Sequence, residues 1–288
     1  IGVAFAGDLL TLFVFWEVMA VCAAVVVWLG GGRAHAAGQR YIVVHVLSGI
    51  LLLAGIAGQV ASTGSIALGA VTLGTPATWL MLLGVLINVA AWPMSAWVPD
   101  AYPSASWSGT VFLSAFTTKA AVLVLIRSFA GTDILVPVGL AMIVYATLYA
   151  AREADIRRLV AYALVVQLGF MVTAIGVGSD LAVNGATAHA IAGIFYQALL
   201  FMIAGSVVLM TGRSDCGALG GLWRKMPVTM VFSIVGAAAI AAFPLTSGYV
   251  AKGMISDAVG AAHLPVAWFV VTAGAAAVVL HAGLRLPW

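Results

Sequence analysis

Charged residues are scarce in this sequence: Asp, Glu, Lys and Arg together make up 7% of its 288 residues. A soluble domain carries roughly 25% charged residues, which cover the surface that faces water. Hydrophobic residues make up 64% of the chain, and its mean hydropathy is +1.17. Because so few charges cannot cover a water-facing surface, the chain is expected to lie mostly in the lipid bilayer.

The sequence also lacks the residue patterns of most enzymes. Its two cysteines, Cys22 and Cys216, lie far apart and have no metal, iron–sulfur or redox spacing. No phosphate-binding loop, zinc signature or nucleophile elbow is found. The twelve basic residues form no arm, so the net charge of +3 is no sign of a nucleic-acid partner. We expect no cofactor, no metal, no nucleic acid, and no redox chemistry by this chain alone.

Long apolar runs are abundant, and they predict membrane-spanning helices rather than the short alternating segments of a β-barrel. The windows are 9–29, 41–61, 76–98, 107–125, 134–151, 159–179, 181–211, 228–262 and 264–284. One crossing takes about 20 residues, so 181–211 and 228–262 must tilt, break or run past the headgroups. The expected fold class is an all-α polytopic membrane protein, with about nine transmembrane helices in a single domain, 1–288.

The basic residues support this count of windows. If alternate loops face opposite sides, one side receives only Arg127. The other side receives Arg33, Arg40, Arg152, Arg157, Arg158, Arg213, Arg224, Lys225 and Arg285. Basic loops stay in the cytoplasm, so the pattern predicts a multi-pass protein of the cell inner (plasma) membrane with these loops inside.

Two windows contain residues that interrupt helices. Pro93 and Pro99 lie near the end of one window, and Pro244 and Gly248 lie in the middle of another. Proline removes a backbone donor, and bare backbone at membrane depth must be satisfied by protein or water. Such breaks often line ion sites in transporters, although a simple kink is the alternative. Lys252, which follows the second break, favours the functional interpretation.

Ionisable residues inside other windows are the main candidates for function. A carboxylate such as Glu17 costs several kcal/mol at mid-membrane unless it is paired, hydrated or protonated. Lys119 can titrate if desolvation favours its neutral form, and the hydroxyls of Thr117 and Thr118 lie nearby in the sequence. The alternatives are a carboxylate that snorkels or pairs structurally and a lysine that is permanently paired, for example with Glu17.

Histidines and amides add weaker candidates. The spacings of seven and eight residues from His189 to Tyr196 and Gln197 place the three on one helical face. His45 lies inside the second window. A buried histidine can equally be a hydrogen-bonded packing residue.

Several segments resemble the proton-conducting antiporter-like subunits. This family includes the large membrane subunits of respiratory complex I (NADH-quinone oxidoreductase) and the A-type and D-type subunits of Mrp-type Na⁺/H⁺ antiporters. The segments are Trp16-Glu17, 97–103 (WVPDAYP), 114–119 (SAFTTK), 155–162 with 167–170, and 220–227 (GGLWRKMP). They keep the family's order over nearly the whole chain, and 97–103 and 114–119 look closest to the D-type Mrp subunits.

The resemblance implies a fold of about fourteen helices with two inverted repeats, each with a broken helix. This chain would cover helices five to thirteen, and both of its ends would be truncated. It also implies a proton or ion path, which carries over to Glu17, Lys119, His189 and Lys252. Supporting positions are His45, Asn88, Thr118 and Gln197.

Four positions depart from the family pattern. Asn88, Gly193 and Gln197 stand where the family usually has a lysine, a histidine and a lysine, and Arg157 replaces another lysine. Because Asn88 removes the lysine of the family's usual glutamate–lysine pair, Glu17 is predicted to contact Lys119 or a neighbouring subunit instead.

Three functions follow from the resemblance. The first is proton or monovalent-cation translocation, with Na⁺ as a candidate ion, as a subunit of a multi-subunit Na⁺/H⁺ antiporter. The second is a membrane subunit of a complex I-like oxidoreductase, where other subunits carry out the redox chemistry. The third is a scaffold subunit that has lost transport. In each case the partners are other membrane subunits and the bilayer.

Overall fold

The computed structural model describes residues 1–32 and 34–286, so the predicted inside position of Arg33 lies outside the described residues. The described chain is a bundle of helices. They are α1 Gly2–Phe5, α2 Leu9–Trp28, α3 Ala34–Thr63, α4 Pro76–Asn88, α5 Trp97–Ser104, α6 Trp107–Phe129, α7 Leu135–Arg152, α8 Ile156–Val177, α9 Asp180–Thr211, α10 Pro227–Ile240, α11 Ser247–Ala261 and α12 Pro265–Val278. Short 3₁₀ turns occur at Met94–Ala96, Cys216–Ala218 and Leu222–Arg224, and a π-helix, Val279–Leu284, continues α12.

The helices begin where the sequence offers caps. The side chains of Asp8, Ser106, Asp155 and Ser179 each accept a backbone N–H bond at a helix start, and Thr75 forms a capping box before Pro76. Helices α8 and α9 both end at a glycine in the left-handed conformation, Gly178 and Gly212. Local chemistry therefore sets most of the boundaries.

The described residues contain seven helices that are long and apolar enough to cross a membrane: α2, α3, α6, α7, α8, α9 and α12 with its π-helical end. Windows 76–98 and 228–262 each become two shorter helices, α4 with α5 and α10 with α11. Window 181–211 is one unbroken helix of 32 residues, α9. The prediction of a polytopic all-α membrane fold is confirmed.

Two predicted helix breaks are placed wrongly. Pro93 and Pro244 do lie between helices, but Pro99 lies in the first turn of α5, and Gly248 lies in the first turn of α11. A proline is tolerated in a first turn because the N–H groups there have no partner within the helix. Gly248 serves close packing instead, since a Cβ on it would lie 1.9 Å from the carbonyl oxygen of Ala239.

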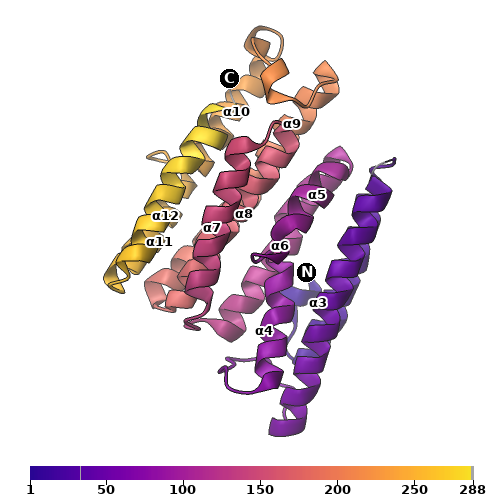
Figure 1. Cartoon of the computed structure of the whole chain (residues 1–288), viewed down its shortest axis with the longest axis vertical. Helices are drawn as coiled ribbons and strands as arrows, with labels where there is room; N and C mark the ends of the chain where they lie inside the picture. Colours follow the sequence, from indigo (N-terminus) through magenta and orange to yellow (C-terminus); the bar gives the residue numbers. More distant parts are fainter. Residues whose placement is uncertain (33, 287–288) are drawn as a thin grey trace.

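Helix α8 is the centre of the bundle, with almost all of its residues buried. In Figure 1, α7, α8 and α9 lie between the group formed by α3, α4 and α5 and the group formed by α10, α11 and α12. Many large apolar side chains are exposed on α2, α3, α9 and α10, which suits surfaces that face lipid or other membrane subunits.

The loops at one end of the bundle are joined by several contacts. The Gly30 turn packs on Ser104, Asp155 bridges to Asp215, and Arg157 donates to the carbonyl of Ala105. At the opposite end, the amide of Gly131 donates to the carbonyl of Ile175, and Arg127 donates to the carbonyl of Ala4. The first end, which we call the basic end, holds the described residues of the predicted basic side.

Candidate functional site

Each broken helix has a side-chain N–H bound to a backbone carbonyl near its break. The break after α4 contains Ala90 at φ 61°, and the indole of Trp97 donates to the carbonyl of Ile87 over 3.0 Å. The break after α10 contains Ala242 at φ 59° and Leu245 at φ 73°. Helix ends leave carbonyls without partners within the helix, and the two breaks place such carbonyls inside the bundle.

Lys252 follows the second break and is 5% exposed. Its ammonium donates to the carbonyl of Ile240, the last residue of α10, over 2.6 Å, and lies 5.0 Å from the ring centre of Phe170. A cation over an aromatic face and at a helix C-terminus is stabilised without a carboxylate. The structure therefore buries Lys252 at the break, as the sequence led us to expect.

Lys119 is buried in the middle of α6. Its ammonium donates to the carbonyl of Ser114 over 2.8 Å and to Oε1 of Gln197 on α9. An amide oxygen can accept this bond, whereas the lysine that the family usually has at Gln197 could not. The hydroxyl of the neighbouring Thr118 is buried and has no hydrogen-bond partner among the described residues.

His189 lies in α9 near both lysines: its ring centre is 6.2 Å from that of Phe170, which Lys252 faces, and 6.2 Å from that of Tyr196, which lies with Lys119 beside Gly193. Its Nε2 is 3.0 Å from Oε1 of Gln167 and 3.3 Å from the hydroxyl of Tyr196. The predicted shared face of His189 and Tyr196 is confirmed by this contact. Gln167 was missed as a partner, although a fully buried amide in an apolar run was the available signal.

Glu17 on α2 packs against α3. A Cβ on Gly49 would lie 1.8 Å from Oε1 of Glu17, so the carboxylate fills the space that this glycine leaves. Both ion pairs found in the described chain join other residues: Arg40 with Asp100 and Arg158 with Glu153. The predicted contact of Glu17 with Lys119 is wrong, because the lysine turns to α9; contact with a neighbouring subunit stays a prediction.

Asn88 is the last residue of α4 and is 1% exposed. Its amide donates to the hydroxyl of Ser48 on α3 over 2.7 Å, and the indole of Trp16 donates to the same hydroxyl over 3.3 Å. Ser48 in turn donates to the carbonyl of Gly84 over 2.7 Å. A neutral hydrogen-bond junction of three helices thus stands beside Glu17.

His45 lies one turn before Ser48 on α3. Its Nδ1 is 2.9 Å from the carbonyl of Tyr41, and its ring stacks on Tyr41 and meets the edge of Trp97. These contacts explain why a histidine is stable in this apolar position. They link it to the broken helix through Trp97, and its Nε2 has no partner in the described part of the chain.

A series of hydrogen-bonded side chains, which the sequence did not predict, leads from the basic end towards Lys119. An open cavity of about 710 Å³ lies there, with Arg157 on its wall. The Arg157 guanidinium stacks on Trp107 and donates to Thr110 over 2.6 Å. Thr110 donates to the carbonyl of Tyr102, whose hydroxyl bonds to Thr117. The polar groups of this series are hydroxyls and one guanidinium. No short sequence motif identifies such a combination.

Comparisons with known proteins agree with this architecture. Residues 6–278 match the family model described as NADH:quinone oxidoreductase/Mrp antiporter, TM. The chain is 29% identical to NADH-quinone oxidoreductase subunit N of Desulforudis audaxviator over 88% of this chain and 54% of that one. It is 28% identical to the D-type subunit of the Na⁺/H⁺ antiporter of Alkalihalophilus pseudofirmus over 87% of this chain and 55% of that one.

Among solved structures, the chain superposes on one in the Mrp complex from Dietzia sp. DQ12-45-1b with a TM-score of 0.92 and 27% identity. The match covers 99% of this chain and 57% of that chain, so the sequence spans little more than half the length of such relatives. The similar identities to an antiporter subunit and to an oxidoreductase subunit leave the predicted D-type branch a prediction. The chain belongs to the NADH:quinone oxidoreductase/Mrp antiporter transmembrane family.

Proposed function

We propose that this chain translocates protons, with a monovalent cation as the exchanged ion, as part of a subunit of a multi-subunit antiporter. The observation that carries the proposal is the burial of two lysines, Lys119 and Lys252, near His189. An ionisable group at membrane depth costs several kcal/mol and is seldom kept without a role in transport. Relatives bear the name Na⁺/H⁺ antiporter, so Na⁺ is the first ion to test.

The proposed path runs through Glu17, Lys119, His189 and Lys252. Gln197 and Gln167 support it, because they hold Lys119 and His189 in place. Thr118, Asn88 and His45 stand beside the path with one buried polar atom each that has no partner in the described chain. Water molecules could bridge such atoms, as they do in other buried polar sites.

The transport proposal is tested by separate Lys252→Ala and Glu17→Ala substitutions in the full assembly. Each is expected to lower the initial rate of ion-driven pH change in vesicles at least about tenfold, because a titrating group is lost from the path. Assembly is checked by the yield of the purified complex. Unchanged rates in both variants, with intact assembly, would leave the scaffold function as the better account.

That scaffold function is favoured by one observation. Asn88 binds Ser48 as a neutral amide and cannot hold a proton in the physiological range. The complex I-like alternative is favoured by the comparable identity to an oxidoreductase subunit. It predicts that the purified assembly contains flavin and iron–sulfur subunits, which absorbance spectra and mass spectrometry would detect.

We further propose that the chain lies in the cell inner (plasma) membrane with its basic end in the cytoplasm. The two native cysteines test this orientation. Cys216 lies at the basic end, whereas Cys22 lies in the apolar helix α2. A membrane-impermeant maleimide is expected to label Cys216 in inside-out vesicles but not in intact cells.

Burial raises the pKa of the Cys216 thiol. The thiolate is the reactive form, so labelling should be slower than that of a free cysteine near neutral pH and should speed up as the pH rises. A Cys216→Ser variant should lose the label altogether. Labelling of Cys216 in intact cells would place the basic end outside and refute the proposed orientation.

A further inference from the structure

His281 is a buried histidine that the proposed path leaves unused. It lies in the π-helix that continues α12, is 5% exposed, and has no partner for either ring nitrogen among the described residues. Two orphaned polar atoms on one buried side chain are unusual, because buried polar groups are almost always paired. Single π-turns within α-helices occur frequently at functional sites.

The π-helix lies close to Lys252. A Cβ on Gly283 would lie 3.3 Å from the Cβ of Ala241, the residue after Ile240, whose carbonyl accepts the Lys252 bond. Val279, at the start of the π-helix, lines a cavity together with Lys252. The charge of Lys252 also acts on the His281 ring. Both groups therefore stand at the same broken end of α10.

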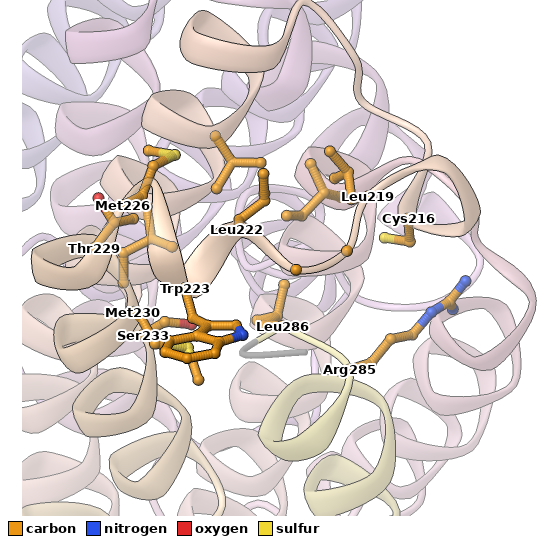
Figure 2. A pocket seen from close by; sticks show the side chains of 15 residues that line it. Cys216, Leu219, Leu222, Trp223, Met226, Thr229, Met230, Ser233, Arg285 and Leu286 are labelled. Carbon is orange, nitrogen blue, oxygen red and sulfur yellow. The ribbon is translucent and has the colours of Figure 1, made fainter.

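A second cavity, of about 180 Å³, lies beyond His281 at the basic end. Arg285, one turn after His281, lines it together with Ser233, whose hydroxyl is buried and has no partner in the described chain. Figure 2 shows Trp223 and Leu286 around this cavity and Arg285 extending on the side where Cys216 lies. The cavity is lined mostly by apolar side chains, and its volume has room for water, which the polar groups of Arg285, Ser233 and Thr229 on its wall can bind.

Arg285 lines the cavity and is the C-cap of the π-helix that contains His281. Its charge acts on the thiol of Cys216, which lines the cavity, and also on the ring of His281. Helices α8, α10 and α12, against which the π-helix packs, contain no acidic residue. The charged groups around His281 are therefore basic, with Lys252 and Arg285 among them.

We propose that His281 transfers protons between the Ser233–Arg285 cavity and Lys252, which gives Lys252 its own access to the basic end. In the step from the basic end towards Lys252, one ring nitrogen takes the excess proton of a protonated water in the cavity, which leaves a neutral water, while the other nitrogen gives its proton to the neutral amine of Lys252. The ring is neutral before and after the step, and rotation or tautomer exchange resets it. This route needs neither Glu17 nor Asn88, so the neutral amide at Asn88 does not interrupt it.

The inference rests on the proposed transport function, and it is tested in the full assembly with His281→Ala. The initial rate of proton transport is expected to fall at least about tenfold. Imidazole and methylimidazoles added at the basic end should restore it, with a rescue that follows the pKa of the added base. A packing role would depend on the size of the base instead. The matched control is Val278→Ala, which removes a fully buried side chain from the same helix and should show no such rescue.

The native thiol of Cys216 gives a second test. Modification with a bulky methanethiosulfonate reagent at alkaline pH fills the cavity, so it is expected to slow transport in the parent protein and leave a Cys216→Ser variant unaffected. Transport that is lost in Lys252→Ala but unchanged in both His281→Ala and the modified parent would refute the His281 route and leave the transport function intact. Unchanged transport in Lys252→Ala, in His281→Ala and in the modified parent would refute both the His281 route and the proposed transport function.

Discussion

Substitution of Gly139 by alanine is expected to lower the apparent melting temperature of the protein in detergent by about 5–10 °C, or to prevent its assembly. Helices α7 and α8 pack closely at Gly139. A Cβ there would lie 2.3 Å from the hydroxyl oxygen and 2.5 Å from the backbone nitrogen of Thr173, and 2.7 Å from the carbonyl of Gly169. Backbone atoms cannot move aside as a side chain can, so the helices must separate. Small residues serve such close helix contacts in membranes.

The matched control is Gly253→Ala. Gly253 lies inside α11 with open space around its Cβ position, so alanine there should leave the melting temperature unchanged or raise it slightly. Thermal unfolding followed by light scattering or by intrinsic fluorescence measures both variants. Equal melting temperatures for Gly139→Ala and the parent would mean that α7 and α8 do not pack as described.

The double substitution Lys119→Leu with Gln197→Leu is expected to abolish proton transport, with a fall of about a hundredfold or more, while the protein becomes no less stable. Lys119 and Gln197 form a buried polar pair between α6 and α9. Replacement of a buried polar pair by apolar residues of similar volume is often neutral or stabilises by about 1–4 kcal/mol. The apparent melting temperature should therefore stay the same or rise.

Two comparisons make this result specific. The single variant Lys119→Leu should be less stable than the double variant, because it leaves Oε1 of Gln197 without its donor. Lys225→Leu, which removes an exposed lysine at the basic end, should keep normal transport. Transport that survives in the double variant would exclude Lys119 from the path, whatever its stability.

The burial of the ionisable residues could be predicted because it depends on sequence position alone. Lys119 and Lys252 lie inside apolar windows of the sequence, and both are buried in the structure. Their partners could not be predicted, because Gln197 is 78 residues from Lys119 along the chain and Ile240 contributes only a backbone carbonyl. Which backbone carbonyl a helix break leaves free to accept a bond can be identified only from the three-dimensional structure.

The same reason explains the errors about Pro99 and Gly248. Proline and glycine signal that something departs from a uniform helix, but they do not tell which residue of the segment departs. The left-handed positions of the breaks belong to Ala90, Ala242 and Leu245, which carry no sequence signal of their own. His281 lies near the end of its apolar window, where a histidine gives little indication of function. Only the structure identifies it, by its place in the π-helix and by its unpaired ring nitrogens.

The bond between Lys252 and the end of α10 has a consequence for the electrostatics of the bilayer interior. A helix C-terminus carries about half an elementary negative charge, because its peptide dipoles are aligned. With the lysine protonated, the pair carries about half a positive charge; with the lysine neutral, it carries about half a negative charge. The net charges of the two states are then nearly equal in size and opposite in sign. The end of a short helix thus halves the net charge of the protonated state without the use of an acidic residue, and the neutral state keeps only the half charge of the helix itself.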